Sequence, residues 1–94
     1  MNQKFHYSLK KKESIQYVSI MGVIDEDNNL QELGERIGPG TLILNLGNIE
    51  RINSCGVRDW VNWLASIEKK GASVVIVEAS PAIVAQINLV NNFA

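Results

Sequence analysis

The stretch of sequence that decides the fold is Thr41-Leu-Ile-Leu-Asn-Leu46, which is followed by a short loop and by Asn53-Ser-Cys-Gly56. A nearly continuous apolar run of this length is typical of a strand that is covered on at least one face. Asn53-Ser-Cys-Gly56 precedes apolar residues at helical spacing, so we expect a helix to begin there. Spare backbone N–H groups and the positive end of the helix dipole make such a position favourable for an anion. The pattern indicates a small polar cluster suited to binding and switching rather than to catalysis.

Upstream of this stretch, the sequence predicts an antiparallel hairpin and a helix. Residues 5–9 and 15–20 are rich in β-branched and aromatic side chains, and the lysine-rich residues 10–14 between them suit a hairpin loop. We expect Met21-Gly22 to close the second strand. The acids and amides of residues 25–29 then supply N-cap and first-turn residues for a helix.

Downstream, the sequence predicts a second helix, another strand and a third helix. The apolar face of the second helix consists of Val57, Trp60, Val61, Leu64 and Ile67. Lys69-Lys70-Gly71 is a typical helix end, because it places cations in the last turn and a glycine after it. The apolar residues 73–77 predict a strand, and Ser80-Pro81 supplies a cap and a first helical residue for the third helix.

The resulting order of elements is β-β-α-β-α-β-α, in one domain that covers residues 1–94. Two β-α-β units imply right-handed crossovers and a mostly parallel four-stranded sheet with an antiparallel strand at one edge. The chain stops at Ala94, just after an apolar helix. Either the domain ends there or the chain is truncated at the C-terminus.

Composition excludes several classes of function. The net charge of −1 gives no footprint for nucleic acid or for an anionic membrane. One cysteine and one histidine rule out an internal disulfide and argue against a zinc site. The sequence has no glycine-rich phosphate loop, residues 1–12 lack the apolar segment typical of a signal peptide, and no apolar run is long enough to span a bilayer. We therefore expect a cytoplasmic protein without a metal or another cofactor.

Asn53 and Ser54 are both good N-cap residues, and Asn53 is favoured because Ile52 and Val57 would then form a hydrophobic staple. The two polar residues could do no more than satisfy helix amides. However, Gly56 within the first turn costs about 1 kcal/mol relative to alanine, which suggests that another backbone or a partner approaches closely.

Ser54 is a candidate for phosphorylation. A phosphate of charge about −1.5 to −2 would be stabilised at a helix start, and Arg58, four residues along, could pair with it. Cys55 could be either a reactive thiolate at the same helix start or a small packed residue. Trp63, at the margin of the apolar face, could be an exposed contact residue or half-buried packing.

These residues resemble the STAS domain of anti-sigma factor antagonists and sulfate transporters. Met21-Gly-Val-Ile-Asp25 is similar to the family's glycine-containing turn after the second strand, and Asn53-Ser-Cys-Gly56 to its Asp-Ser-Ser/Thr-Gly motif. Residues 71–77 and 79–82 resemble the next strand and helix start. The resemblance covers most of the chain. Asn53 and Cys55 depart from the motif, which has an aspartate and a second hydroxyl there.

The resemblance implies a STAS-like fold with the helices mainly on one face of the sheet. It also implies a bacterial signalling protein, not an enzyme, that binds a GHKL-type serine kinase acting as an anti-sigma factor. The phosphoacceptor would be Ser54. The partner-binding residues would be Gly22, Asp25, Asn53, Cys55, Gly56 and Arg58.

Three functions therefore remain open. The first is the phosphorylation-switched binding module. The second, which Asn53 favours, is a STAS domain that lacks the switch and serves as a constitutive interaction or assembly module in a larger signalling protein. The third is a thiol-based redox sensor built on Cys55. A homodimer is one of the oligomeric states left open.

Overall fold

The structure of the protein is a computed structural model that describes residues 4–91, with side chains as far as Gln86. The elements, in chain order, are β1 (His6–Lys12), β2 (Ile15–Ile24), α1 (Leu30–Arg36), β3 (Gly40–Ile52), α2 (Ser54–Lys69), β4 (Ala72–Ala79) and α3 (Pro81–Asn91). The order β-β-α-β-α-β-α that the sequence predicts is confirmed. Within residues 4–91, no helix combines the length and the apolar character that crossing a bilayer requires.

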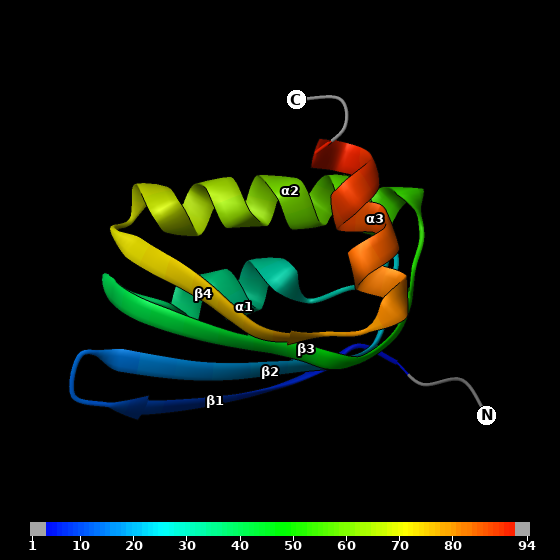
Figure 1. Cartoon of the computed structure of the whole chain (residues 1–94). Coiled ribbons are helices and arrows are strands. Elements are labelled where there is room, and N and C mark those ends of the chain that lie inside the picture. Colours follow the sequence, from blue (N-terminus) through cyan, green and yellow to red (C-terminus); the bar gives the residue numbers. More distant parts are fainter. Residues whose placement is uncertain (1–3, 92–94) are drawn as a thin grey trace.

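The four strands form one sheet in the order β1-β2-β3-β4. β1 pairs with β2 in antiparallel fashion, whereas the pairs β2/β3 and β3/β4 are parallel. In the described part of the chain, the three helices lie on the same side of this sheet, and no helix covers the opposite side (Figure 1). The predicted mixed sheet with helices mainly on one face is therefore confirmed.

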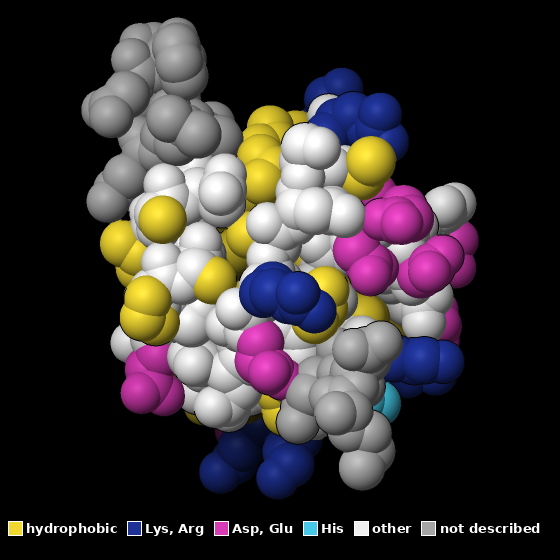
Figure 2. All heavy atoms as spheres, turned by 90° about the vertical axis from the view of Figure 1, so that its right-hand side faces the viewer, with side chains coloured by type: hydrophobic (Ala, Val, Ile, Leu, Met, Phe, Trp, Pro, Cys, Tyr) yellow, Lys and Arg dark blue, Asp and Glu magenta, His cyan; other side chains and the backbone are white. Residues whose placement is uncertain are grey.

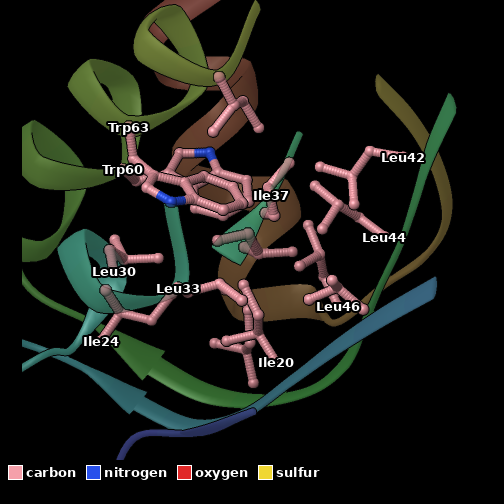
Figure 3. Packing of buried hydrophobic residues seen from close by; sticks show 14 of the residues in the cluster. Ile20, Ile24, Leu30, Leu33, Ile37, Leu42, Leu44, Leu46, Trp60 and Trp63 are labelled. Atoms are coloured by element: carbon pink, nitrogen blue, oxygen red, sulfur yellow. The ribbon is translucent and has the colours of Figure 1, made fainter. Parts of the chain in front are cut away.

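The core lies between the sheet and the helices. The strands contribute alternate residues to it, as their period of two requires. The labelled side chains of β2, β3 and α1 converge in one layer in Figure 3, and those that are fully buried include Ile20, Ile24, Leu33, Leu42, Leu44 and Leu46. Trp60 and Trp63 of α2 stack above this layer, with 5.3 Å between the ring centroids.

Trp63 lies deeper than either of the two alternatives that the sequence left open, an exposed contact residue and half-buried packing. Its side chain is only 5% exposed, so it is a core residue and not a surface contact. Gly34 of α1 makes the room, because a Cβ atom at that position would lie 3.1 Å from Nε1 of the indole. The packing of α1 on α2 therefore depends on a glycine that faces a tryptophan.

The hairpin differs from the prediction at its lysines. Lys10, Lys11 and Lys12 belong to β1, where they pair with Tyr17, Gln16 and Ile15. The turn itself consists of Glu13 and Ser14, and Glu13 adopts a left-handed conformation with φ 58°. Lysines on an edge strand are compatible with strand geometry because their side chains reach solvent.

Strands β2 and β3 are also longer than predicted. β2 continues through Met21-Gly22, which we expected to close it, and ends at Ile24. Gly22 has φ 90°, and the pairing with β3 shifts register on both sides of this dipeptide. β3 likewise continues beyond Leu46 to Ile52. As a result, both strands extend to the N-terminus of α2.

Candidate functional site

The candidate site is the N-terminus of α2 together with the loop between β2 and α1. β3 ends at Ile52, and Asn53 connects it directly to Ser54, the first residue of α2. The backbone N–H of Asn53 donates to the carbonyl oxygen of Ile24 at 3.2 Å, which ties this helix start to the end of β2. The extended strands thus bring the predicted cluster next to the loop that carries Asp25.

Asn53 is the N-cap of α2, as the sequence predicts. Its side-chain Oδ1 accepts a hydrogen bond from the backbone N–H of Gly56 at 2.8 Å. Its Nδ2 donates to Oε1 of Glu26 at 2.9 Å. One amide side chain therefore both caps the helix and holds the β2–α1 loop.

Ser54 is not needed for this cap. The residue is exposed, and its hydroxyl forms no hydrogen bond with any other residue from 4 to 86, the range in which side chains are described. The hydroxyl is therefore available to solvent at a helix start, where the backbone favours negative charge.

Arg58, one turn further along α2, is also exposed. Its Nε lies 3.6 Å from Oδ1 of Asp59, and its side chain is 71% exposed. An exposed pair of this kind contributes little to stability and leaves the guanidinium able to change partners. Arg58 therefore provides a cation near Ser54 that the fold does not hold rigidly.

The two glycines among the predicted partner-binding residues are buried. Gly22 lies within β2, and Gly56 is covered by that strand. A Cβ atom on Gly56 would overlap the carbonyl oxygen of Ile24 and approach the side chain of Ile52. The predicted close approach at Gly56 is therefore a contact with the protein's own backbone. Both glycines lie beneath the surface of the site, so a partner would not contact them directly.

The β2–α1 loop is held in place by its own polar side chains. Oδ1 of Asp25 accepts from the backbone N–H of Asp27 at 2.9 Å. Asn28 donates from Nδ2 to Oδ2 of Asp59 at 3.0 Å, and its Oδ1 accepts from the backbone N–H of Leu30 at 3.0 Å. The Asn28–Asp59 bond is a second connection between this loop and α2.

Glu26 carries a negative charge beside the helix start. The backbone N–H of Glu26 and the side-chain amide of Asn53 both donate to its carboxylate, and these hydrogen bonds hold its pKa below the ordinary value of 4.5. Sequence reasoning missed Glu26, Asn28 and Asp59 as site residues. It assigned the acids of this loop to the dipole of α1, and no local signal connects Glu26 with a residue 27 positions away.

A shallow depression of about 420 Å³ opens beside the helix start. Asp25 and Asn53 line one part of it, Arg51 of β3 lines another, and Ala82 and Gln86 of α3 complete it. Figure 2 looks at this end of the molecule and shows one larger group of acidic side chains, further acidic side chains apart from it, and separate basic side chains. The surface beside Asn53 is thus hollowed and carries charges of both signs.

Cys55 is a free, half-buried thiol next to Ser54. The one histidine, His6, lies on β1 and pairs there with Met21. No group of three or more His, Cys, Asp or Glu side chains in the described part of the chain is arranged to hold a metal ion.

Comparison with known proteins supports the fold. No family model matches this chain, and no curated protein is significantly similar to it. Among solved structures, the one described as "Crystal Structure Analysis of Mglu" is similar, with a TM-score of 0.60 and 18% sequence identity. The alignment covers 73% of this chain but only 18% of that chain. At this identity the similarity shows a shared fold alone.

Proposed function

We propose that this protein is a STAS-type binding module, similar to anti-sigma factor antagonists, that is switched by phosphorylation of Ser54. The observation that carries the proposal is the division of roles at the start of α2. Asn53 supplies the cap, and Ser54 keeps an exposed hydroxyl with no hydrogen bond inside the described chain. A serine that only stabilised the helix would be expected to make the capping bond itself.

Phosphorylation at this position would change the surface more than the fold. The phosphate would gain from the helix dipole and from the exposed guanidinium of Arg58. It would also lie near the carboxylate of Glu26, which repels it. Because these effects oppose each other at a solvated surface, we expect the change in folding free energy to be small. The effect on a docked protein is larger, because the added charge and bulk occupy the contact itself.

The partner that we propose is a GHKL-type serine kinase that also acts as an anti-sigma factor. The hydroxyl oxygen of Ser54 would attack the γ-phosphorus of ATP, ADP would leave, and the hydroxyl proton would be released to a base of the kinase. In this scheme the protein is a substrate and a binding partner, not an enzyme, and it functions in the cytoplasm, where ATP is present. The depression lined by Asp25, Arg51 and Asn53 would accept a side chain of the kinase.

The second candidate is a constitutive interaction module that uses the same surface without a switch. The contact between Asn53 and Glu26 favours it, because the position before the serine carries an amide that is already engaged with the loop. A kinase that recognises a carboxylate at position 53 would find an amide there, because the nearby carboxylate belongs to Glu26 on the β2–α1 loop.

Mapping of phosphate separates the two candidates. The purified protein is incubated with a GHKL-type serine kinase from its source organism and ATP, and the products are analysed by peptide mass spectrometry. We expect one phosphate on Ser54, its loss in Ser54→Ala, and its retention in the control Ser66→Ala on the same helix. Binding of the kinase without any label would favour the constitutive module, and label confined to another residue would contradict the proposal.

A further inference from the structure

The face of the sheet that no helix covers within the described residues, the open face, exposes apolar side chains of parallel strands. Side chains alternate along a strand, so Tyr17, the neighbour of the buried Val18, lies on the open face. Ile43 of β3 pairs with Tyr17 and with Val75 of β4, which extends this row to the edge of the sheet. Parallel strands are usually covered on both faces. Because Tyr17 and Val75 are 42% and 47% exposed, the open face is a candidate interaction surface.

The open face carries cations along its β1 edge and an anion along its β4 edge. Lys10 of β1 pairs with Tyr17, and Lys12 lies two residues further along, so both lysines are on this face. Asn45 of β3, which lies between two buried leucines, donates from Nδ2 to Oε2 of Glu78 at 2.8 Å. The carboxylate of Glu78 is therefore on the open face as well. Over this part of the sheet, the face is positive on the β1 side and negative on the β4 side.

We infer that the open face packs against the open face of a second copy of this chain, about a two-fold axis that runs parallel to the strands between β2 and β3. This axis places β1 of each copy over β4 of the other, and β2 over β3. Each row of the sheet then meets the same row in reverse order, and the central row consists of Lys10, Tyr17, Ile43 and Val75. The ring of Tyr17 would cover Ile43 of the second copy. The aliphatic stem of Lys10 would cover Val75 of the second copy.

Charge complementarity favours this occupant and this orientation. The open face carries both signs on opposite sides, so the two-fold axis makes it complementary to itself. Glu78 of the second copy lies one row along from the position over which Lys10 packs, a distance of about 6.6 Å along the strand that these two long side chains can bridge. An axis perpendicular to the strands would instead place β1 over β1 and bring the lysines of both copies together, which is unfavourable. Nearly aligned strands are also a usual geometry for two packed sheets.

Packing through the open face leaves Ser54 accessible in both copies. Ser54 is the first residue of α2, and α2 lies on the other side of the sheet (Figure 1). The dimer would therefore carry the two candidate sites in its two outer helical layers. The inference concerns a separate surface and does not depend on the function proposed for Ser54.

The test is the oligomeric state of the full chain, measured by sedimentation velocity over a dilution series. We expect a reversible dimer for the unmodified protein and a monomer for Val75→Lys, which places a lysine against Lys10 of the second copy. The matched control is Val61→Lys on α2, because Val61 is 41% exposed in the helical layer and its substitution should leave the dimer intact. Far-UV circular dichroism of each variant verifies that these substitutions leave the fold unchanged.

Charge reversal then tests the orientation. Lys10→Glu faces Glu78 of the second copy with a like charge and should weaken dimerisation at least about tenfold. The double variant Lys10→Glu with Glu78→Lys should restore it. Three results would overturn the inference: a monomer at every concentration, a dimer that persists in folded Val75→Lys, or a double variant no tighter than Lys10→Glu. A monomer whose open face binds a different protein would equally contradict packing against a second copy.

Discussion

Asn53 donates its side-chain N–H to the carboxylate of Glu26 at 2.9 Å and, through its other terminal atom, caps α2 at Gly56. An aspartate could not make both bonds, since it has no donor for a carboxylate at neutral pH. An aspartate at position 53 would instead place two negative charges side by side. The asparagine that departs from the STAS motif is therefore matched to a glutamate on the neighbouring loop.

The first prediction concerns this cap. Asn53→Ala removes the acceptor for the N–H of Gly56, so we expect the free energy of unfolding to fall by about 1 kcal/mol. Urea denaturation measures the change. Asn62→Ala is a suitable control because Asn62 is exposed in the middle of the same helix. Equal stability of the two variants would show that the side chain of Asn53 contributes nothing to the start of α2.

The second prediction concerns the pKa of Glu26. Hydrogen bonds from its own backbone N–H and from Asn53 lower this pKa in the folded protein. The resulting stabilisation is present above the pKa of the unfolded chain and is lost as the pH falls through the folded value. Nuclear magnetic resonance titration of the side-chain carboxyl carbon should give a pKa below 4.5.

Two variants verify the source of this pH dependence. In Asn53→Ala the pKa of Glu26 should rise toward its ordinary value, because one of the two donors is lost. In Glu26→Gln, the loss of stability in moderate acid should be smaller than in the unmodified protein. An unchanged pKa in Asn53→Ala would contradict the hydrogen bond on which the description of the site depends.

The third prediction concerns Gly56. A methyl group there would overlap the carbonyl oxygen of Ile24, so Gly56→Ala should lower the free energy of unfolding by about 2–3 kcal/mol. Gly38→Ala is the matched control, since nothing lies within 4 Å of a Cβ atom at that position. Thermal and urea denaturation of both variants test the difference. Similar losses of stability in Gly56→Ala and Gly38→Ala would show that α2 is free to move away from β2.

The fourth prediction separates a surface switch from a structural serine. Because Ser54 is exposed at the positive end of α2, Ser54→Asp should change the free energy of unfolding by no more than about 0.5 kcal/mol. Ser66→Asp, in the C-terminal half of α2, should destabilise the protein more, because it loses the hydrogen bond to the carbonyl of Trp63 and opposes the helix dipole. Unfolding of Ser54→Asp under native conditions would exclude a phosphate-tolerant site.

Sequence signals that extend over a few residues were sufficient to predict the order of the elements and both ends of α2. The capping amide at Asn53, the cations before Gly71 and the serine–proline pair at Ser80 each act within a few residues, and the structure has them as expected. The sequence also identified the helix start that carries Ser54. Each of these features depends only on residues that are close together in the sequence.

Features that depend on distant residues could not be predicted in this way. Met21-Gly22 resembles a strand end locally, but parallel pairing with β3 carries the strand through it. Trp63 lies at the margin of the apolar face of its own helix, and the contact with Gly34 of another helix, which helps to bury it, has no local signal. The bond between Glu26 and Asn53 likewise exists only because β2 and β3 both extend to the start of α2.

The most direct test of the account compares the two states of Ser54 in binding. Phosphoserine is incorporated at position 54 during translation, and isothermal titration calorimetry measures the affinity for the GHKL-type kinase that phosphorylates the unmodified protein. We predict tight binding of the unmodified chain and a loss of at least about tenfold on phosphorylation, equivalent to about 1.4 kcal/mol. Equal affinity of the two forms, with the fold of both intact, would contradict a switch at this serine.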